Sequence, residues 1–220
     1  LFTAAYAIIN SYVGLIFRAM ATDFYPKLSS LSSDLKSSFK LVNQQAEVAI
    51  IILGPILAFF MIFIKWMIYI LYSEKFSGAE DMLYWAALGM YFKAASWSVA
   101  YILLTQSKSK LFFYNELIAN AYILIFNIIG YWIAGLQGLG ISFLIGYILY
   151  FIQIFLVNKI KYSFKFSNGF ISMFIFQLLI GLLCFILIRL ESDYTISLGS
   201  ILIFISCLHS YFSLNNRIDL

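Results

Sequence analysis

Long apolar stretches separated by short polar connections dominate this chain. Seven windows come close to the roughly 20 apolar residues that a helix needs to cross a bilayer core of about 30 Å. Their approximate bounds are 2–25, 46–72, 82–105, 112–134, 139–158, 169–188 and 195–214. The windows are continuous rather than alternating, which favours helices over the strands of a membrane barrel. The pattern therefore predicts an all-α, polytopic transmembrane helix bundle of about seven spans.

The composition supports a membrane protein over a soluble one. Apolar residues make up 63% of the chain, charged residues 11%, and the mean hydropathy is +0.94. A soluble domain is roughly half apolar and about a quarter charged, and it could not bury this much apolar surface. The net charge of +4 is small and lies in the connections, so no nucleic-acid partner is expected.

The basic residues of the connections fall on alternate sides of the predicted bundle. The segments after the first, third and fifth spans, together with the C-terminus, carry nine of them: Lys27, Lys36, Lys40, Lys108, Lys110, Lys159, Lys161, Lys165 and Arg217. The other connections carry only Lys75 and Arg189, beside several acidic residues. The positive-inside rule then places the first residue outside and the C-terminus in the cytoplasm. Because the chain lacks an initial Met, we expect a fragment of a longer protein.

Lys93 is the clearest charge within an apolar span. It lies 12 residues after Asp81 and 13 before Gln106, which places it near the bilayer midplane. A basic side chain there costs about 2.5–3.5 kcal/mol on insertion scales, so such residues usually face a cavity or a partner. We expect Lys93 to line a substrate or ion cavity; the alternative is a buried pair with a carboxylate from another span.

Arg18 lies closer to the end of the first span, and its role has two readings. Asn10, Gly14 and Arg18 are spaced by four and share one helical face. That face either lines the same cavity or carries Arg18 to the wet interface. Pro26 is predicted to end this span, since the residue before a proline avoids helical geometry. Lys65, next to Trp66, is typical of an interfacial anchor.

A polar stripe marks the fourth span. Glu116, Asn120 and Asn127 lie on one helical face over about 16 Å at the rise of an α-helix. The stripe indicates a substrate pathway, or alternatively hydrogen bonds between helices. Glu116 adds a titratable group, so it is one candidate for ion coupling. Glu47, early in the second span, is another, unless it is simply wetted at the interface.

Small residues in the fifth span predict close packing rather than chemistry. Gly138, Ser142 and Gly146 repeat every four residues, with Tyr150 next on the same face. The sequence holds no P-loop and no Cys/His cluster, and its single histidine has no catalytic companions. We therefore expect no enzyme, no catalytic residue, no metal and no cofactor.

Four stretches in order carry a family resemblance: "ATDFYPKLS", "WAALGMYFKAASW", "SKLFFYNELIAN" and "GLQGLGISFLIGYILY". Over about residues 5–165 the chain resembles the C-terminal half of bacterial polysaccharide exporters. These are the O-antigen flippases of the Wzx type, in the multidrug/oligosaccharidyl-lipid/polysaccharide exporter superfamily. The resemblance implies a two-bundle flippase fold, with residues 1–165 as the C-terminal bundle and 166–220 as two additional helices. The first bundle and the seventh helix would precede this chain.

The resemblance also implies a function. Such exporters flip undecaprenyl-pyrophosphate-linked oligosaccharide from the cytoplasmic to the periplasmic leaflet of the inner membrane, by alternating access, for surface polysaccharide such as the O-antigen of lipopolysaccharide. The implied partners are the lipid-linked oligosaccharide, the phospholipid bilayer, H+ or Na+ as coupling ion, and polysaccharide polymerase machinery. The candidate substrate-cavity residues are Arg18, Lys93, Asn10, Asn120 and Asn127. The candidate ion-coupling residues are Glu116 and Glu47.

Three other functions remain open at this point. An ion-coupled multidrug antiporter of the same superfamily is the nearest, although a pump for cationic drugs should prefer an acidic cavity, and Lys93 is basic. A polymerase or ligase of lipid-linked glycans usually carries a large outer loop, whereas the longest outer connection here is "SEKFSGAED". A membrane scaffold without transport activity is the third.

Overall fold

Six helices and no strand make up the described part of the computed structural model, which covers residues 2–71, 78–106 and 109–218. The side chains of residues 2–13, 71, 109 and 216–218 are not described. The helices are α1 (Phe2–Ser30), α2 (Leu35–Leu71), α3 (Glu80–Thr105), α4 (Ser109–Tyr162), α5 (Asn168–Arg189) and α6 (Thr195–Ile218). Five of them, α2 to α6, are long and apolar enough to cross a membrane. The predicted all-α membrane bundle is thereby confirmed.

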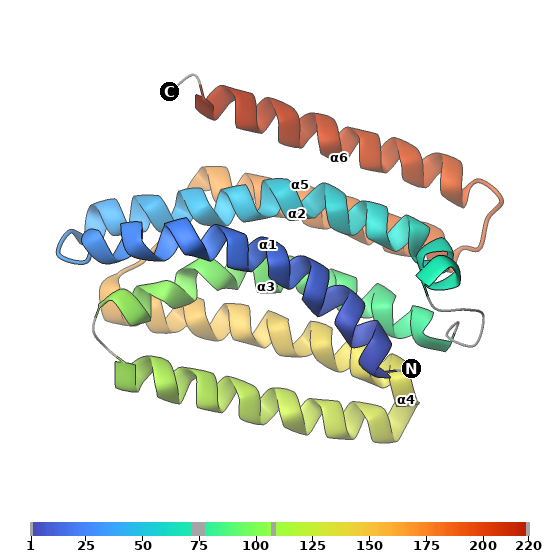
Figure 1. The fold of residues 1–220 in the computed structure, drawn as a ribbon, viewed down its shortest axis with the longest axis horizontal. Coiled ribbons are helices and arrows are strands. Elements are labelled where there is room, and N and C mark those ends of the chain that lie inside the picture. The colour runs from blue at the N-terminus through green and yellow to red at the C-terminus, as the bar shows by residue number, and fades with distance from the viewer. Residues whose placement is uncertain (1, 72–77, 107–108, 219–220) are drawn as a thin grey trace.

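The long helix α4 is a hairpin of two antiparallel arms (Figure 1). Its backbone leaves helical geometry at Ala134 (φ −137°, ψ 22°) and Gly135 (φ 56°, ψ −133°). A positive φ of this kind is tolerated by glycine, which has no Cβ. We call residues 109–133 the first arm and residues 136–162 the second arm. They correspond to the predicted spans 112–134 and 139–158, so the described residues form seven helical segments.

The two arms meet most closely next to their turn. A Cβ on Gly138 would overlap the carbonyl of Gly130, so the two backbones touch there. Further from the turn, the Ser142 hydroxyl donates to the Phe126 carbonyl at 2.6 Å. Glycines and a hydroxyl at such positions allow helices in lipid to approach closely and to hydrogen-bond. The small-residue spacing of the sequence therefore identified a real packing face.

The prediction that Pro26 ends the first span is wrong. α1 continues through Pro26 to Ser30. A proline removes one backbone donor and disfavours helical geometry at the preceding residue, but here the helix continues for another turn. This turn is held by local contacts: Lys27 pairs with Asp23 at 2.5 Å, one helical turn away, and Leu28 is fully buried.

The second helix also starts earlier than predicted, at Leu35 rather than near residue 46. Asp34 caps it. Its Oδ1 accepts from the amides of Lys36 at 3.0 Å and Ser37 at 3.3 Å, and its Oδ2 accepts from the Ser37 hydroxyl at 2.5 Å. The bonds from Ser37 hold the pKa of the Asp34 carboxyl below its ordinary value. A side-chain cap of this kind satisfies amides that have no partner in the first helical turn, so a serine-rich segment that looked like a loop is helical.

α3 is the central helix of the bundle (Figure 1). It packs against α1, α2, α4 and α5, and buried side chains lie on all of its faces. Tyr91, fully buried, donates to the carbonyl of Gly54 in α2 at 3.2 Å. That carbonyl lies beside Pro55, where the regular bonding of α2 is interrupted. The bond therefore ties α3 to α2 next to its proline.

α5 and α6 both pack against α2, and α6 lies at the opposite edge of the bundle from the first arm of α4 (Figure 1). Gln177 of α5 joins them: its Nε2 donates to the Ser210 hydroxyl at 3.0 Å, and its Oε1 accepts from the Ser206 hydroxyl at 2.5 Å. Gln177 and Ser206 are fully buried. A Cβ on Gly54 would come within 2.6 Å of the Gln177 side chain. We call Gln177, Ser206 and Ser210 the glutamine seam.

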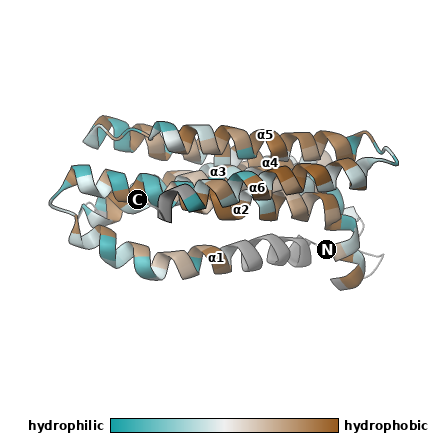
Figure 2. Cartoon of the chain, turned by 90° about the horizontal axis from the view of Figure 1, so that it is seen from above, coloured by the Kyte–Doolittle hydropathy of each residue, from teal (hydrophilic) through white to brown (hydrophobic). Residues whose placement is uncertain are grey.

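Large apolar side chains cover much of the outer surface. Trp132 is 88% exposed and Ile160 is 83% exposed. Figure 2 shows apolar residues along the lengths of the helices and more hydrophilic ones toward the end that carries the α1–α2 turn. In water such a surface would be a liability; in lipid it faces a matching solvent, as the composition predicts.

Candidate functional site

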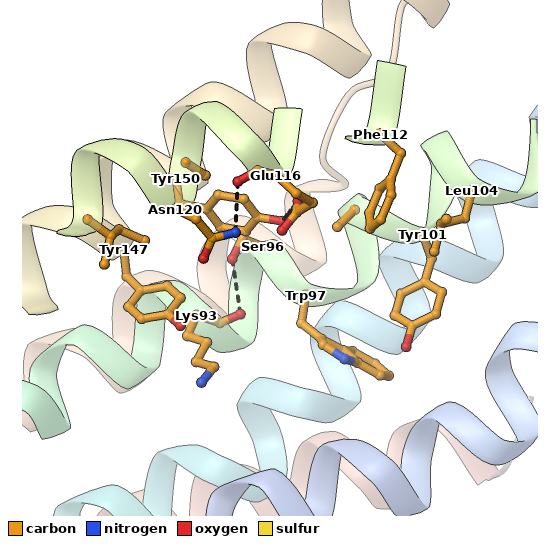
Figure 3. Close-up of a pocket in the computed structure, with 13 residues that line it drawn as sticks. Lys93, Ser96, Trp97, Tyr101, Leu104, Phe112, Glu116, Asn120, Tyr147 and Tyr150 are labelled. Atoms are coloured by element: carbon orange, nitrogen blue, oxygen red, sulfur yellow. Dashed lines mark hydrogen bonds between the residues drawn. The ribbon is translucent and has the colours of Figure 1, made fainter. Parts of the chain in front are cut away.

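A cavity of about 280 Å³ lies between α3 and the two arms of α4 (Figure 3). One face of α3 contributes Lys93, Ser96, Trp97, Ala100, Tyr101 and Leu104. The first arm contributes Phe112, Glu116, Ala119, Asn120 and Ile123, and the second arm Tyr147 and Tyr150. The small side chains of Ala100 and Ala119 leave room between the helices. The cavity therefore brings together three of the residues expected to be functional: Lys93, Glu116 and Asn120.

Lys93 enters the cavity from the middle of α3. Its ammonium nitrogen lies 5.1 Å from the centre of the Tyr147 ring and 5.9 Å from that of Phe143. A cation within about 6 Å of an aromatic face is attracted by the ring quadrupole, more so away from water. The nitrogen of the half-buried Lys93 thus lies beside the second arm of α4, where an ammonium group would attract an anion more strongly than in water.

Glu116 stands across the cavity and links the two arms of α4. Its Oε1 accepts from the Tyr150 hydroxyl at 2.6 Å and from the Asn115 amide at 3.2 Å. Next to it, Gln153 of the second arm donates to the Asn115 side chain at 2.9 Å. Hydrogen bonds to a carboxylate are shorter and stronger than those between neutral groups. The cavity therefore holds an acidic and a basic group, supplied by different helices.

Asn120 completes the polar side of the cavity. Its amide nitrogen donates to the backbone carbonyl of Glu116 at 2.7 Å, and the side chain is exposed. Asn127, predicted on the same stripe, is half-buried and is not among the residues that line the cavity. The stripe of the first arm thus divides: its Glu116–Asn120 part faces the cavity, and Asn127 lies beyond it.

The other predicted site residues lie elsewhere. Arg18 is exposed on α1, and Asp23 of the same helix pairs with Lys27. Arg18 does not line the cavity of Lys93. The side chain of Asn10 lies outside the part of the chain that the structure describes.

Glu47 is buried in α2, apart from the cavity. Its Oε1 accepts from the Ser167 hydroxyl at 2.6 Å, and Ser167 caps the N-terminus of α5 by accepting from the Phe170 amide at 3.0 Å. Neighbouring Asn43 accepts from the Ser167 amide at 2.7 Å. In this structure Glu47 therefore fixes the start of α5 onto α2, a contact that the sequence did not indicate.

Aromatic residues are the part of the cavity that the sequence analysis missed. Trp97 and Tyr101 follow Lys93 by four and eight residues, so they share its face of α3. Tyr147 was not singled out, and Tyr150 was assigned only to packing. Spacing from Lys93 was the available signal for Trp97 and Tyr101; nothing in the sequence indicated which rings of the second arm would meet them.

Fold and cavity define a polytopic helical membrane protein with a charged cavity between its helices. The same fold is found in a solved structure titled "Lipid II flippase MurJ, inward closed conformation", with a TM-score of 0.70 and 15% sequence identity. The match covers 99% of this chain and 48% of that one, so this chain spans about half its length. No family model and no curated protein matches the sequence. At this identity the likeness establishes the fold.

Proposed function

We propose that this chain is part of a flippase that carries undecaprenyl-pyrophosphate-linked oligosaccharide from the cytoplasmic to the periplasmic leaflet of a bacterial inner membrane, for surface polysaccharide. The observation that carries the proposal is the likeness of nearly the whole chain to half of a lipid II flippase. The sequence resemblance to Wzx-type exporters supports the oligosaccharide as cargo. In this proposal residues 1–165 belong to the C-terminal bundle, and residues 166–220 are two additional helices.

The cavity supports an anionic substrate. Lys93 offers a charge near the middle of α3, and the polar groups of Glu116 and Asn120 can bind hydroxyls. Alternating access would expose this cavity to one leaflet and then to the other. Glu116 is our candidate for coupling to H+ or Na+; Glu47, held at the start of α5, is a second one. The basic residues of the connections support a cytoplasmic C-terminus in this proposal.

Substitution of Lys93 tests the proposal most directly. The full-length protein, reconstituted in liposomes, should expose a lipid-linked oligosaccharide to a membrane-impermeant glycosidase. Removing one charged hydrogen-bonding partner costs about 1.5–3 kcal/mol, so Lys93→Gln should slow flipping by about 10-fold or more. Lys65→Gln, which changes an exposed lysine near the far end of α2, is the matched control and should leave the rate within about 2-fold.

The possible results separate the whole proposal from the role of Lys93. Absence of flipping by the wild-type protein, with export of a cationic dye instead, would replace the flippase by a drug antiporter. Flipping that is equally fast in wild type and Lys93→Gln would remove Lys93 from the substrate path.

A further inference from the structure

A second polar cavity, of about 260 Å³, lies where α2 ends, α3 begins and α5 connects to α6. This is the end of the bundle opposite the α1–α2 turn (Figure 1). We call the cavity the end pocket. Its charged lining residues are two bases, Lys65 and Arg189, and three acids, Glu80, Asp81 and Glu191. The end pocket therefore brings charges of both signs together from three helices and a connection.

Arg189 is held in position at the end of α5. Its Nη1 donates to the Asp81 carboxylate of α3 at 2.7 Å. Its guanidinium carbon lies 5.2 Å from the centre of the Phe185 ring and 6.0 Å from that of Tyr84. A guanidinium carries five N–H donors in a planar fork that suits a phosphate, and 38% of this side chain is exposed. Arg189 is therefore a fixed and accessible donor group for an anion.

Glu191 occupies a backbone position that favours glycine. It follows Leu190, the C-cap of α5, and its φ is 48°. The residue after a helix C-cap often has a positive φ and is then usually glycine, because a Cβ is disfavoured in this conformation. The exposed Glu191 nevertheless lines the end pocket. The chain thus places a carboxylate beside Arg189 at a position where glycine would fit the backbone better.

The surroundings of the end pocket are typical of the headgroup level of a bilayer. Trp66 of α2 is 58% exposed and Tyr194, just before α6, is 70% exposed. Such rings are enriched at both membrane interfaces. Ile186 and Leu182 lie one and two turns before Arg189 on the same face of α5, and they are 51% and 38% exposed. Apolar surface therefore leads away from the pocket toward the bilayer, which suits an amphiphile.

The charges of the end pocket select among headgroups. Its three carboxylates exceed its two bases, so a purely anionic headgroup or a free phosphate would be repelled. In the part of the chain that the structure describes, no group of three or more His, Cys, Asp and Glu residues could hold a metal ion. A choline headgroup has a cation without N–H donors. A primary ammonium next to a phosphate offers donors to a carboxylate and acceptors to a guanidinium.

We propose that the end pocket binds the headgroup of a phospholipid that combines a phosphate with a primary amine, as phosphatidylethanolamine does. Arg189 binds the phosphate and Glu191 binds the ammonium group. The bound molecule is a lipid of the surrounding bilayer and not the cargo, and it joins the ends of α3 and α5. This site shares no lining residue with the cavity of Lys93.

Lipid binding to the full-length protein in detergent tests the site, measured by native mass spectrometry. The probes are phosphatidylethanolamine, phosphatidylcholine and phosphatidylglycerol with identical acyl chains. The wild type should bind the ethanolamine lipid about 2- to 10-fold more tightly than either of the others. Glu191→Gln should remove this preference, because it weakens the bond to the ammonium group. Its binding of phosphatidylcholine should stay within about 2-fold, and its binding of phosphatidylglycerol should not weaken.

Asp193→Asn is the matched control. Asp193 is an exposed carboxylate in the same connection and does not line the end pocket, so the lipid preference should persist. Arg189→Gln should weaken all three lipids by about 10-fold or more, since each carries a phosphate.

Glu191→Gly separates binding from stability. Glycine suits the positive φ, so the thermal unfolding midpoint of the lipid-free protein should not fall. The affinity for phosphatidylethanolamine should nevertheless fall as in Glu191→Gln. A role of Glu191 in structure alone would instead lower the midpoint and change the binding of all three lipids alike.

Equal binding of the three lipids by the wild type overturns the proposal, and so does a preference that survives in both Glu191 variants. Glycerophosphoethanolamine, the soluble headgroup without acyl chains, is the last probe. If it binds as tightly as the whole lipid, the ligand is a soluble amine and the lipid site is rejected. None of these failures affects the proposed flippase, because flipping is measured with a different ligand at a different cavity.

Discussion

The polar side chains around Gln177 and those around Lys93 both lie among apolar helices, but only the second group surrounds open space. Gln177 is fully buried, its amide bonds Ser206 and Ser210 of α6, and Gly54 of α2 closes over it. Lys93 and Glu116 are half-buried and line a cavity of about 280 Å³. The first group is uncharged and tightly packed, whereas the second contains charged side chains and borders open space.

The difference teaches how to separate structural from functional polarity within a membrane bundle. A buried amide whose bonds all go to neighbouring helices fixes the distance between those helices. A charged group within a membrane-spanning helix is costly to insert and usually faces a cavity or a partner, so a charged group that lines a cavity is a candidate for binding a ligand. Stability should therefore depend on the glutamine seam, and transport on the cavity.

The largest loss of stability is expected from Gly54→Leu. The new side chain would begin within 2.6 Å of the Gln177 amide, and Ser206 and Ser210 hold that amide in place. Overpacking of this kind costs about 1–3 kcal/mol. The thermal unfolding midpoint of the full-length protein in detergent should fall clearly. Gly14→Leu is the control, since no atom lies within 4 Å of a Cβ there; equal midpoints for both variants would contradict a tightly closed seam.

A moderate loss is expected from Gln177→Leu. The substitution keeps apolar volume but removes the bonds to α6, and side-chain hydrogen bonds between membrane helices contribute about 0.6–1.7 kcal/mol. Part of that loss arises because the Ser206 and Ser210 hydroxyls lose their hydrogen-bonding partner. Adding Ser206→Ala and Ser210→Ala should therefore recover some stability, measured as a mutant cycle of unfolding midpoints. Strictly additive losses would mean that the three side chains do not form one network.

The smallest loss of stability is expected from Tyr150→Phe in the cavity. The Glu116 carboxylate keeps its bond from Asn115, and a cavity of this size admits water, which can replace the lost hydroxyl. The change in unfolding free energy should be about 0.5 kcal/mol or less. A loss as large as that of Gln177→Leu would show that the cavity is as tightly sealed as the seam, and the contrast between the two regions would fail.

The sequence was most informative where a single helix carries the pattern. Apolar length alone located the helical segments, and the spacing of Gly138 and Ser142 identified the contact face of the second arm. The same spacing could not reveal Gly130 as the partner, because that glycine lies on the other arm. The prediction from Pro26 was wrong, because the local preference of a proline against a helix is overridden by the contacts of the turn that follows.

For the same reason, the sequence predicted only some of the residues that line the cavity. Lys93, Glu116 and Asn120 are conspicuous because each is polar in an apolar span. The hollow between them depends on Ala100 and Ala119, which look ordinary in the sequence and matter only because two helices meet there. Glu47 shows the opposite case: a conspicuous carboxylate whose hydroxyl partner, Ser167, comes from a connection 120 residues away.

The sharp reversal at Ala134 and Gly135 also bears on how the protein enters its membrane. The two arms of α4 carry matching polar groups, with Glu116 bonded to Tyr150 and Asn115 to Gln153. If the two arms leave the insertion machinery as a pair, each arm supplies hydrogen-bonding partners that lower the cost of burying the other arm's polar groups in lipid. A lone first arm would have to take Glu116 into hydrocarbon unaided. We therefore expect the turn to act during biogenesis, as the point that commits two segments to the bilayer in one step.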